Sequence, residues 1–172
     1  MSTKPDAWTL SPQATAAPEL WRGCDGFFPF WSGGATTEDI SPLRTETTDS
    51  GTPTSRLGLM GRVIEFTGSS DYINLPENPY DENPVTTIVA LIRVNSISTN
   101  QSVITNMDSN NDGWLFLVDS SDFNSGNTNT VVFRNGTGSG QLSIAAPSNS
   151  IIEDKWHLIG VLLDFDKSVF EI

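Results

Sequence analysis

The sequence predicts an all-β fold in which two antiparallel sheets pack face to face as a sandwich. Short runs of β-branched and aromatic residues recur about every eight to twelve residues between polar turns, which is the spacing of sandwich strands. No segment places apolar residues at the i, i+3, i+4, i+7 positions of an amphipathic helix over three turns. Strands that follow one another without helices favour a sandwich or a barrel.

The expected strands combine high β-propensity with at least partial alternation of apolar and polar residues. They are Phe27–Trp31, Arg62–Thr67, Asp71–Leu75, Val85–Val94, Ser102–Thr105, Trp114–Val118, Thr130–Arg134, Gln141–Ala145, Lys155–Phe165 and Ser168–Ile172. Pro29 has no N–H for the ladder, so the first strand should lie at a sheet edge or carry a bulge. Val85–Val94 alternates only in part, which predicts that both of its faces are covered.

The segments between the strands complete the expected organisation. Ser102–Thr105 and Trp114–Val118 flank a polar turn, which predicts a hairpin, and residues 32–60 predict a long polar connection. Residues 1–20 are rich in Pro, Ala and Thr without periodicity, so they predict an extended N-terminal arm. Residues 21–172 are then expected to form the folded domain, and 172 residues are enough for one core.

The charge of the chain disfavours two classes of partner. The net charge is −12, from nine basic and 21 acidic residues, without a Lys/Arg cluster. Nucleic-acid binding requires a basic stripe that displaces counterions, and anionic membranes attract basic segments, so neither partner is expected. The acidity fits a soluble surface, or carboxylates that hold Ca²⁺.

The cysteine content and the N-terminus bear on the cellular compartment. Cys24 is the single cysteine, so no disulfide can form within the chain, and a small buried residue is expected there. The first residues lack the apolar stretch of a secretory signal, which predicts a protein made in the cytoplasm. The longest apolar run, Leu158–Leu163, is too short to span a bilayer.

Four segments occur in the order found in one large family of sandwiches. Gly61–Pro76 has the pattern G-x-x-x-x-F-x-G-x-x-D-Y-I-x-L-P, and Thr87–Val94 looks like the strand that follows it. Asp112–Leu117 is similar to a G-W-x-L-x-L strand, and Asp154–Asp164 is similar to an x-x-W-H-x-I-A-V-x-x-D strand. By these motifs residues 61–172 resemble the concanavalin A-like lectin/glucanase superfamily in its laminin G-like branch, which implies a jelly-roll arrangement of the two sheets.

A looser resemblance concerns Glu19–Gly34, which looks like the first strand of this domain in bacteriophage virion proteins. Family members continue past a strand like Ser168–Ile172 into a Y-V-N-G turn and further strands. The sequence stops there, which predicts an open sheet edge covered by a neighbouring chain, or an incomplete sequence. Enzymatic members carry an E-x-D-x-x-E strand, which this sequence lacks.

The residues give little basis for catalysis, and no catalytic residue is assigned. Glycoside hydrolysis needs two carboxyl groups about 5–10 Å apart on either side of one bond. Asp164 and Asp166 have the even spacing that one strand face requires, but Asp164 is explained as the end of the Trp-His strand. His157, the single histidine, lies beside Trp156 in that strand and is expected in the core or an interface rather than as a base.

One segment resembles the start of a Ca²⁺-binding loop. The pattern D-x-[DN]-x-[DN]-G begins at Asp108, and its candidate ligands are Asp108, Asn110, Asp112 and Asp119. Asp119 is shorter than the usual bidentate Glu, and residues 114–118 read as a strand instead of a loop. The alternative is a polar hairpin turn, which Asn and Gly favour without any metal.

Sugar binding requires an aromatic platform beside amides or carboxylates. The candidate glycan-binding residues are Asn106, Asp122, Asn124 and Tyr80. Asp108, Asn110, Asp112 and Asn127 could add to the polar rim, and Trp114 is a second possible platform. Trp114 and Trp156 are nevertheless expected to serve the core.

Three functions remain open at this point. The first is a non-catalytic bacteriophage virion surface protein, a head decoration or fibre-type module that docks on other virion proteins or on copies of itself. The second is a free-standing carbohydrate-binding module for a cell-surface glycan. The third is a relative of the glycoside hydrolases. Fold resemblance alone does not decide among them.

Overall fold

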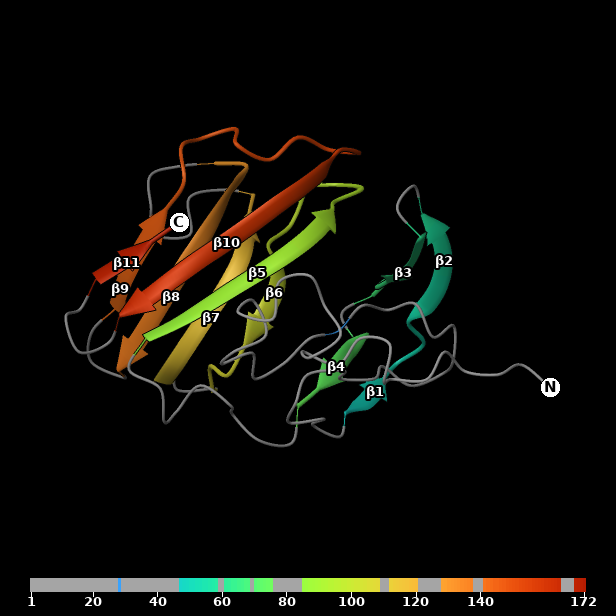
Figure 1. Ribbon diagram of the computed structural model, residues 1–172, viewed down its shortest axis with the longest axis horizontal. Helices are drawn as coiled ribbons and strands as arrows, with labels where there is room; N and C mark the ends of the chain where they lie inside the picture. The colour runs from blue at the N-terminus through green and yellow to red at the C-terminus, as the bar shows by residue number, and fades with distance from the viewer. Residues whose placement is uncertain are drawn as a thin grey trace, which may run out of the picture. The chain divides into compact units, whose positions relative to one another are not determined.

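The computed structural model describes residues 28, 47–58, 61–68, 70–75, 85–108, 112–120, 128–137, 141–164 and 169–172. The regular structure in these residues consists of eleven strands, every pairing is antiparallel, and there is no helix (Figure 1). The all-β prediction is therefore confirmed. The chain divides into two compact units, Met1–Pro79 and Tyr80–Ile172. The expected arm, residues 1–20, lies outside the described residues.

The first unit contains two small sheets. Strand β1 (Thr48–Ser50) pairs with β4 (Tyr72–Asn74), and β2 (Thr54–Gly58) forms a hairpin with β3 (Gly61–Glu65). The strands expected near β3 and β4 are confirmed.

The prediction that residues 32–60 are a connection without strands is wrong where the structure describes them, because β1 and β2 lie there. These two strands are polar, and no described residue of the first unit is buried. Strands β1 and β2 are therefore held by backbone pairing with β4 and β3. Because they bury no apolar face, the sequence shows no alternation that would predict them.

The second unit contains two larger sheets. One has the order β11-β10-β5, with β5 Val85–Arg93, β10 Trp156–Asp164 and β11 Val169–Glu171. The other has the order β6-β7-β8-β9, with β6 Gln101–Thr105, β7 Asp112–Asp119, β8 Thr130–Thr137 and β9 Gln141–Ala145. All seven strands were expected from the sequence, and β6 and β7 form the expected hairpin. Phe27–Trp31 is described only at Phe28, which is half-buried and outside any strand.

One apolar core joins the two sheets of the second unit. Ile88 and Val161 come from β5 and β10, and they share a buried cluster with Phe116 and Phe133 from β7 and β8. Figure 1 shows β5 and β10 as a layer in front of β7 and β8. The ring of Trp114 stacks on Phe133 with 6.2 Å between centroids, so the expectation that Trp114 serves the core is confirmed. This arrangement is that of a β-sandwich.

Strand β5 differs from the prediction in one respect. Thr86 and Ile88 point into the core, whereas Val85, Val89 and Leu91 are exposed. The expectation that both faces of this strand are covered is therefore wrong for the structure described. Apolar residues on both sides of a strand suggest burial on both sides, but only one side of β5 meets the other sheet.

Candidate functional site

The hairpin turn between β6 and β7 contains several of the residues predicted to bind a ligand. The Asn106 side-chain Oδ1 accepts a hydrogen bond from the Trp114 N–H at 2.7 Å, and the Asn106 N–H donates to the Trp114 carbonyl at 3.1 Å. The Asp108 Oδ1 accepts from the Asp112 N–H at 2.9 Å. Gly113 has a φ of +107°, and a Cβ there would lie 2.8 Å from the Asn106 carbonyl oxygen. These polar groups close the turn.

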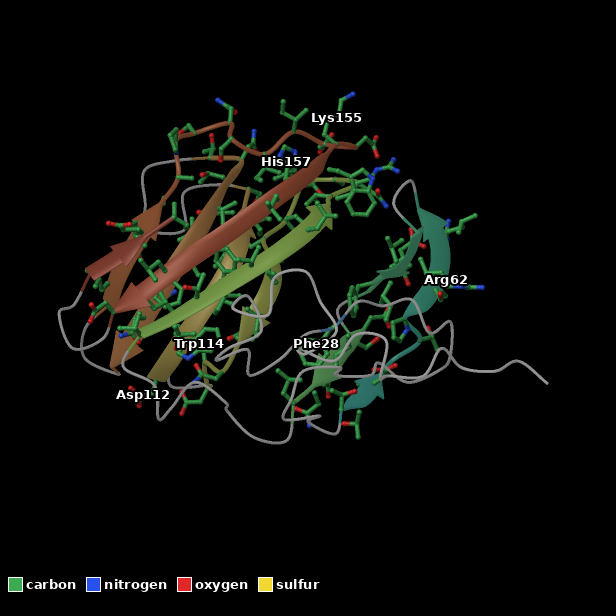
Figure 2. The ribbon with its side chains drawn as sticks, in the orientation of Figure 1. Phe28, Arg62, Asp112, Trp114, Lys155 and His157 are labelled. Atoms are coloured by element: carbon green, nitrogen blue, oxygen red, sulfur yellow. The ribbon has the colours of Figure 1, made fainter. Side chains whose placement is uncertain are left out.

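The four candidate Ca²⁺ ligands are not all brought together. Asp112 lies at the start of β7, near Trp114 (Figure 2), and Asp108 is hydrogen-bonded to it, whereas Asp119 is fully buried at the other end of the strand. Seven residue steps of an extended strand separate Asp112 from Asp119, or about 23 Å. Asn110 lies outside the described residues. Within the described ranges no cluster of three His, Cys, Asp or Glu side chains could hold a metal ion. The geometry therefore matches the polar hairpin turn, the alternative reading of this segment.

The candidate glycan residues are described only in part. Asn106 lies in the turn with its amide oxygen already bonded to the Trp114 N–H, and Tyr80, Asp122 and Asn124 lie outside the described residues. Trp114 is 6% exposed, so its ring offers no face to a sugar. The possibility that Trp114 is a platform is thereby excluded.

His157 positions a turn. Its Nε2 lies 3.1 Å from both the N and the O of Ile152. One ring nitrogen cannot serve both groups, so it either donates to the carbonyl or accepts from the N–H, according to the tautomer. Figure 2 shows the residue at the start of β10. The ring thus ties this strand to the segment that leads into it.

The carboxylates near the Trp-His strand are also engaged in structural contacts. The Glu153 Oε1 accepts from the Ile97 N–H at 2.7 Å, and Asp154 forms an ion pair with Arg93 at 2.8 Å. Asp164 is buried at the end of β10, and Asp166 lies outside the described residues.

Sequence reasoning assigned no role to Asp71, which holds together two turns of the first unit. One carboxylate oxygen accepts from the Thr52 N–H at 2.9 Å, and the other accepts from the Thr67 N–H at 2.8 Å and the Thr67 hydroxyl at 3.1 Å. The Thr52 bond first, and then the Thr67 N–H bond, lower the pKa of Asp71, although desolvation partly opposes them. The turn composition Thr-Gly-Ser-Ser-Asp before β4 was the available signal.

Sequence reasoning also missed an exposed aliphatic surface on the three-stranded sheet. Its members are aliphatic, exposed and on the side of β5 and β10 away from the core; we call them the β5–β10 outer face. They are Val85, Val89, Leu91, Leu158 and Leu162. Leu158 lies directly opposite Leu91 across the ladder, and Val89 lies opposite Gly160.

In comparisons with known proteins, no protein family, curated protein or solved structure matches the sequence. In the described part of the chain no helix is long and apolar enough to cross a membrane.

Proposed function

We propose that this chain is a non-catalytic surface protein of a bacteriophage virion, a head decoration or fibre-type module with a lectin-like jelly-roll fold. It acts by docking on other virion subunits. The observation that carries the proposal is the β5–β10 outer face, where five aliphatic side chains lie together in solvent. Contiguous apolar surface of this kind marks protein–protein contacts.

The resemblance to the laminin G-like branch supports the same reading. Its four motifs coincide with β3 and β4, with β5, with β7 and with β10. The strands that carry the second and fourth motifs, β5 and β10, pair over nine consecutive residues. Each motif therefore falls on a strand of an antiparallel sheet, as that family requires.

The use of the polar side chains supports a docking role instead of chemistry. Asn106, Asp108 and Glu153 each accept a backbone N–H, Asp154 binds Arg93, and the His157 ring binds the Ile152 backbone. Groups held in this way stabilise turns and strand ends.

Mass spectrometry of purified virions tests the proposal. Particles from a host that carries the gene are banded twice on a density gradient, and peptides of this chain are quantified against the major capsid protein. The expected result is a constant copy number per particle across preparations. A chain that is abundant in the lysate but absent from the banded particles would contradict the proposal.

Two further assays address the other readings. A glycan array probed with and without Ca²⁺ tests the predicted contribution of Tyr80, Asp122 and Asn124, and binding there would add a recognition role. Release of reducing sugar from β-glucans would contradict the non-catalytic assignment.

A further inference from the structure

The β5–β10 outer face is a continuous neutral surface. Leu158 is 74% exposed and Val89 is 61% exposed, and they are diagonal neighbours on paired strands, a separation of about 7–8 Å. The outward positions between the two ends of the strands are all uncharged. They are Val85, Thr87, Val89 and Leu91 on β5, and Leu158, Gly160 and Leu162 on β10.

Among the described residues, the charged groups next to this surface lie at its two ends, and the two ends differ. At one end, Arg93 is paired with Asp154, and Lys155 is exposed; among the residues that the structure describes, Lys155 has no ion-pair partner. At the other end, Asp164 closes β10, and Glu171 lies exposed opposite Leu162. Figure 2 shows Lys155 at the start of β10, and Figure 1 shows β11 at the opposite end of that strand.

We infer that two copies of this chain associate through the β5–β10 outer face, packed face to face with their strands antiparallel. The inference rests on the proposed docking role and names its partner and its surface. In a chain of net charge −12, a neutral aliphatic surface is where two copies can approach with the least repulsion. Closed two-fold pairing is the common way in which such a self-complementary surface is buried.

The charges at the two ends determine the direction of the pairing. A two-fold axis across the strands places Lys155 of one copy over Glu171 of the other, and each pair occurs twice. A parallel arrangement would instead place Lys155 beside the Lys155 of the other copy, and Glu171 beside the other Glu171. Facing sheets pack about 10 Å apart, which brings Leu158 and Val89 of one copy into contact with the aliphatic residues of the second.

Sedimentation equilibrium of the full chain tests the surface. The wild type is expected at twice the chain mass at micromolar concentration. Leu158→Asp and Val89→Asp are expected to raise the dimer dissociation constant about a hundredfold or more, because each places a charge in the buried centre. Leu57→Asp is the matched control, since Leu57 is 86% exposed and lies outside the surface. Circular dichroism confirms that each variant is folded.

A charge exchange tests the direction without altering the aliphatic centre. Lys155→Glu and Glu171→Lys are each expected to weaken the dimer, and the double variant is expected to restore it. A wild type that stays monomeric at every concentration, or a dimer unchanged by Leu158→Asp and Val89→Asp, overturns the inference. If each single variant weakens the dimer and the double variant does not restore it, the antiparallel arrangement is overturned. A monomer found in virions contradicts this inference alone, whereas a dimer absent from virions contradicts only the proposed function.

Discussion

Asp71 and Asn106 act in the same way although they lie in different units. Each side chain accepts a backbone N–H close to a strand end, that of Thr67 just after β3 in one case and that of Trp114 near the start of β7 in the other. Trp114 is buried, so leaving its N–H without the Asn106 acceptor would destabilise the protein by about 1–3 kcal/mol. Asn106, a candidate ligand in the sequence, and Asp71, which had no expected role, therefore both act as acceptors that hold turns.

Asp71 predicts a specific pH dependence in the first unit. Hydrogen bonds lower its folded-state pKa below 3.8, so its contribution to stability is fully present above the unfolded-state pKa and is lost as pH falls through the folded value. By NMR, the Thr67 amide shift should titrate with a midpoint below 3.8. The Asp71→Asn variant should lose this titration, and Tyr72→Phe should keep it. A midpoint above 3.8 would show that these hydrogen bonds do not form.

Gly113 allows a direct test of the hairpin turn. Its φ of +107° and the 2.8 Å from a built Cβ to the Asn106 carbonyl oxygen leave no room for a side chain. Gly113→Ala is expected to lower the free energy of unfolding by at least about 1–2 kcal/mol, which thermal denaturation would record as several degrees in Tm. Gly68→Ala is the control, because a Cβ there meets no atom closer than 4.0 Å. Equal effects of the two changes would contradict the turn geometry.

At the scale of elements, the strands of the second unit could be predicted because a shared core imposes a pattern on them. Phe116 and Val118 on β7, and Val131 and Phe133 on β8, point into this core, and Leu117 and Val132 on the opposite face are buried as well, so both strands read as short apolar runs. Strands β1 and β2 could not be predicted, because they bury nothing and pair through the backbone. The long distance between Asp112 and Asp119 could not be predicted either, because the spacing of the motif residues along the sequence is the same whether they lie in a loop or in an extended strand.

The core of the sandwich should be sensitive to truncation at its centre. Phe133 is 1% exposed and contacts Trp114, so Phe133→Ala is expected to lower the free energy of unfolding by about 3–5 kcal/mol. Phe66→Ala, at a position that is 47% exposed, should change it by less than about 1 kcal/mol. Urea denaturation followed by tryptophan fluorescence measures both values. A small effect at Phe133 would mean that the two sheets do not share this core.

The β6–β7 hairpin also predicts how the chain responds to Ca²⁺. Because Asp108 bonds to the Asp112 N–H and Asp119 lies at the far end of β7, millimolar Ca²⁺ and EDTA should leave Tm unchanged. If the folded chain had a Ca²⁺ site, Ca²⁺ at a hundred times the Kd of that site would add about 2.7 kcal/mol to the stability. A rise in Tm with Ca²⁺ that Asp108→Asn abolishes would restore the metal hypothesis.

At the scale of the molecule, the second unit buries one face of its three-stranded sheet and leaves the other in solvent. The sequence predicts the sheet, since β5 and β10 were both expected as strands. It cannot predict which side of β5 meets the core, because both sides carry aliphatic residues. The docking surface therefore depends on three-dimensional packing, and the proposed function depends on the side of β5 and β10 that faces away from the core.

Amide hydrogen exchange followed by NMR on monomeric protein tests this arrangement most directly. Strand β8 pairs on both sides over Val132–Gly136, so slow exchange is predicted at every amide in that stretch. In the part of the chain that the structure describes, strand β5 pairs with β10 alone, so slow exchange is predicted at every second amide from Val85 to Arg93. Uninterrupted protection along β5 would reveal another strand at that edge, and rapid exchange throughout β5 and β10 would show that the sheet itself does not form.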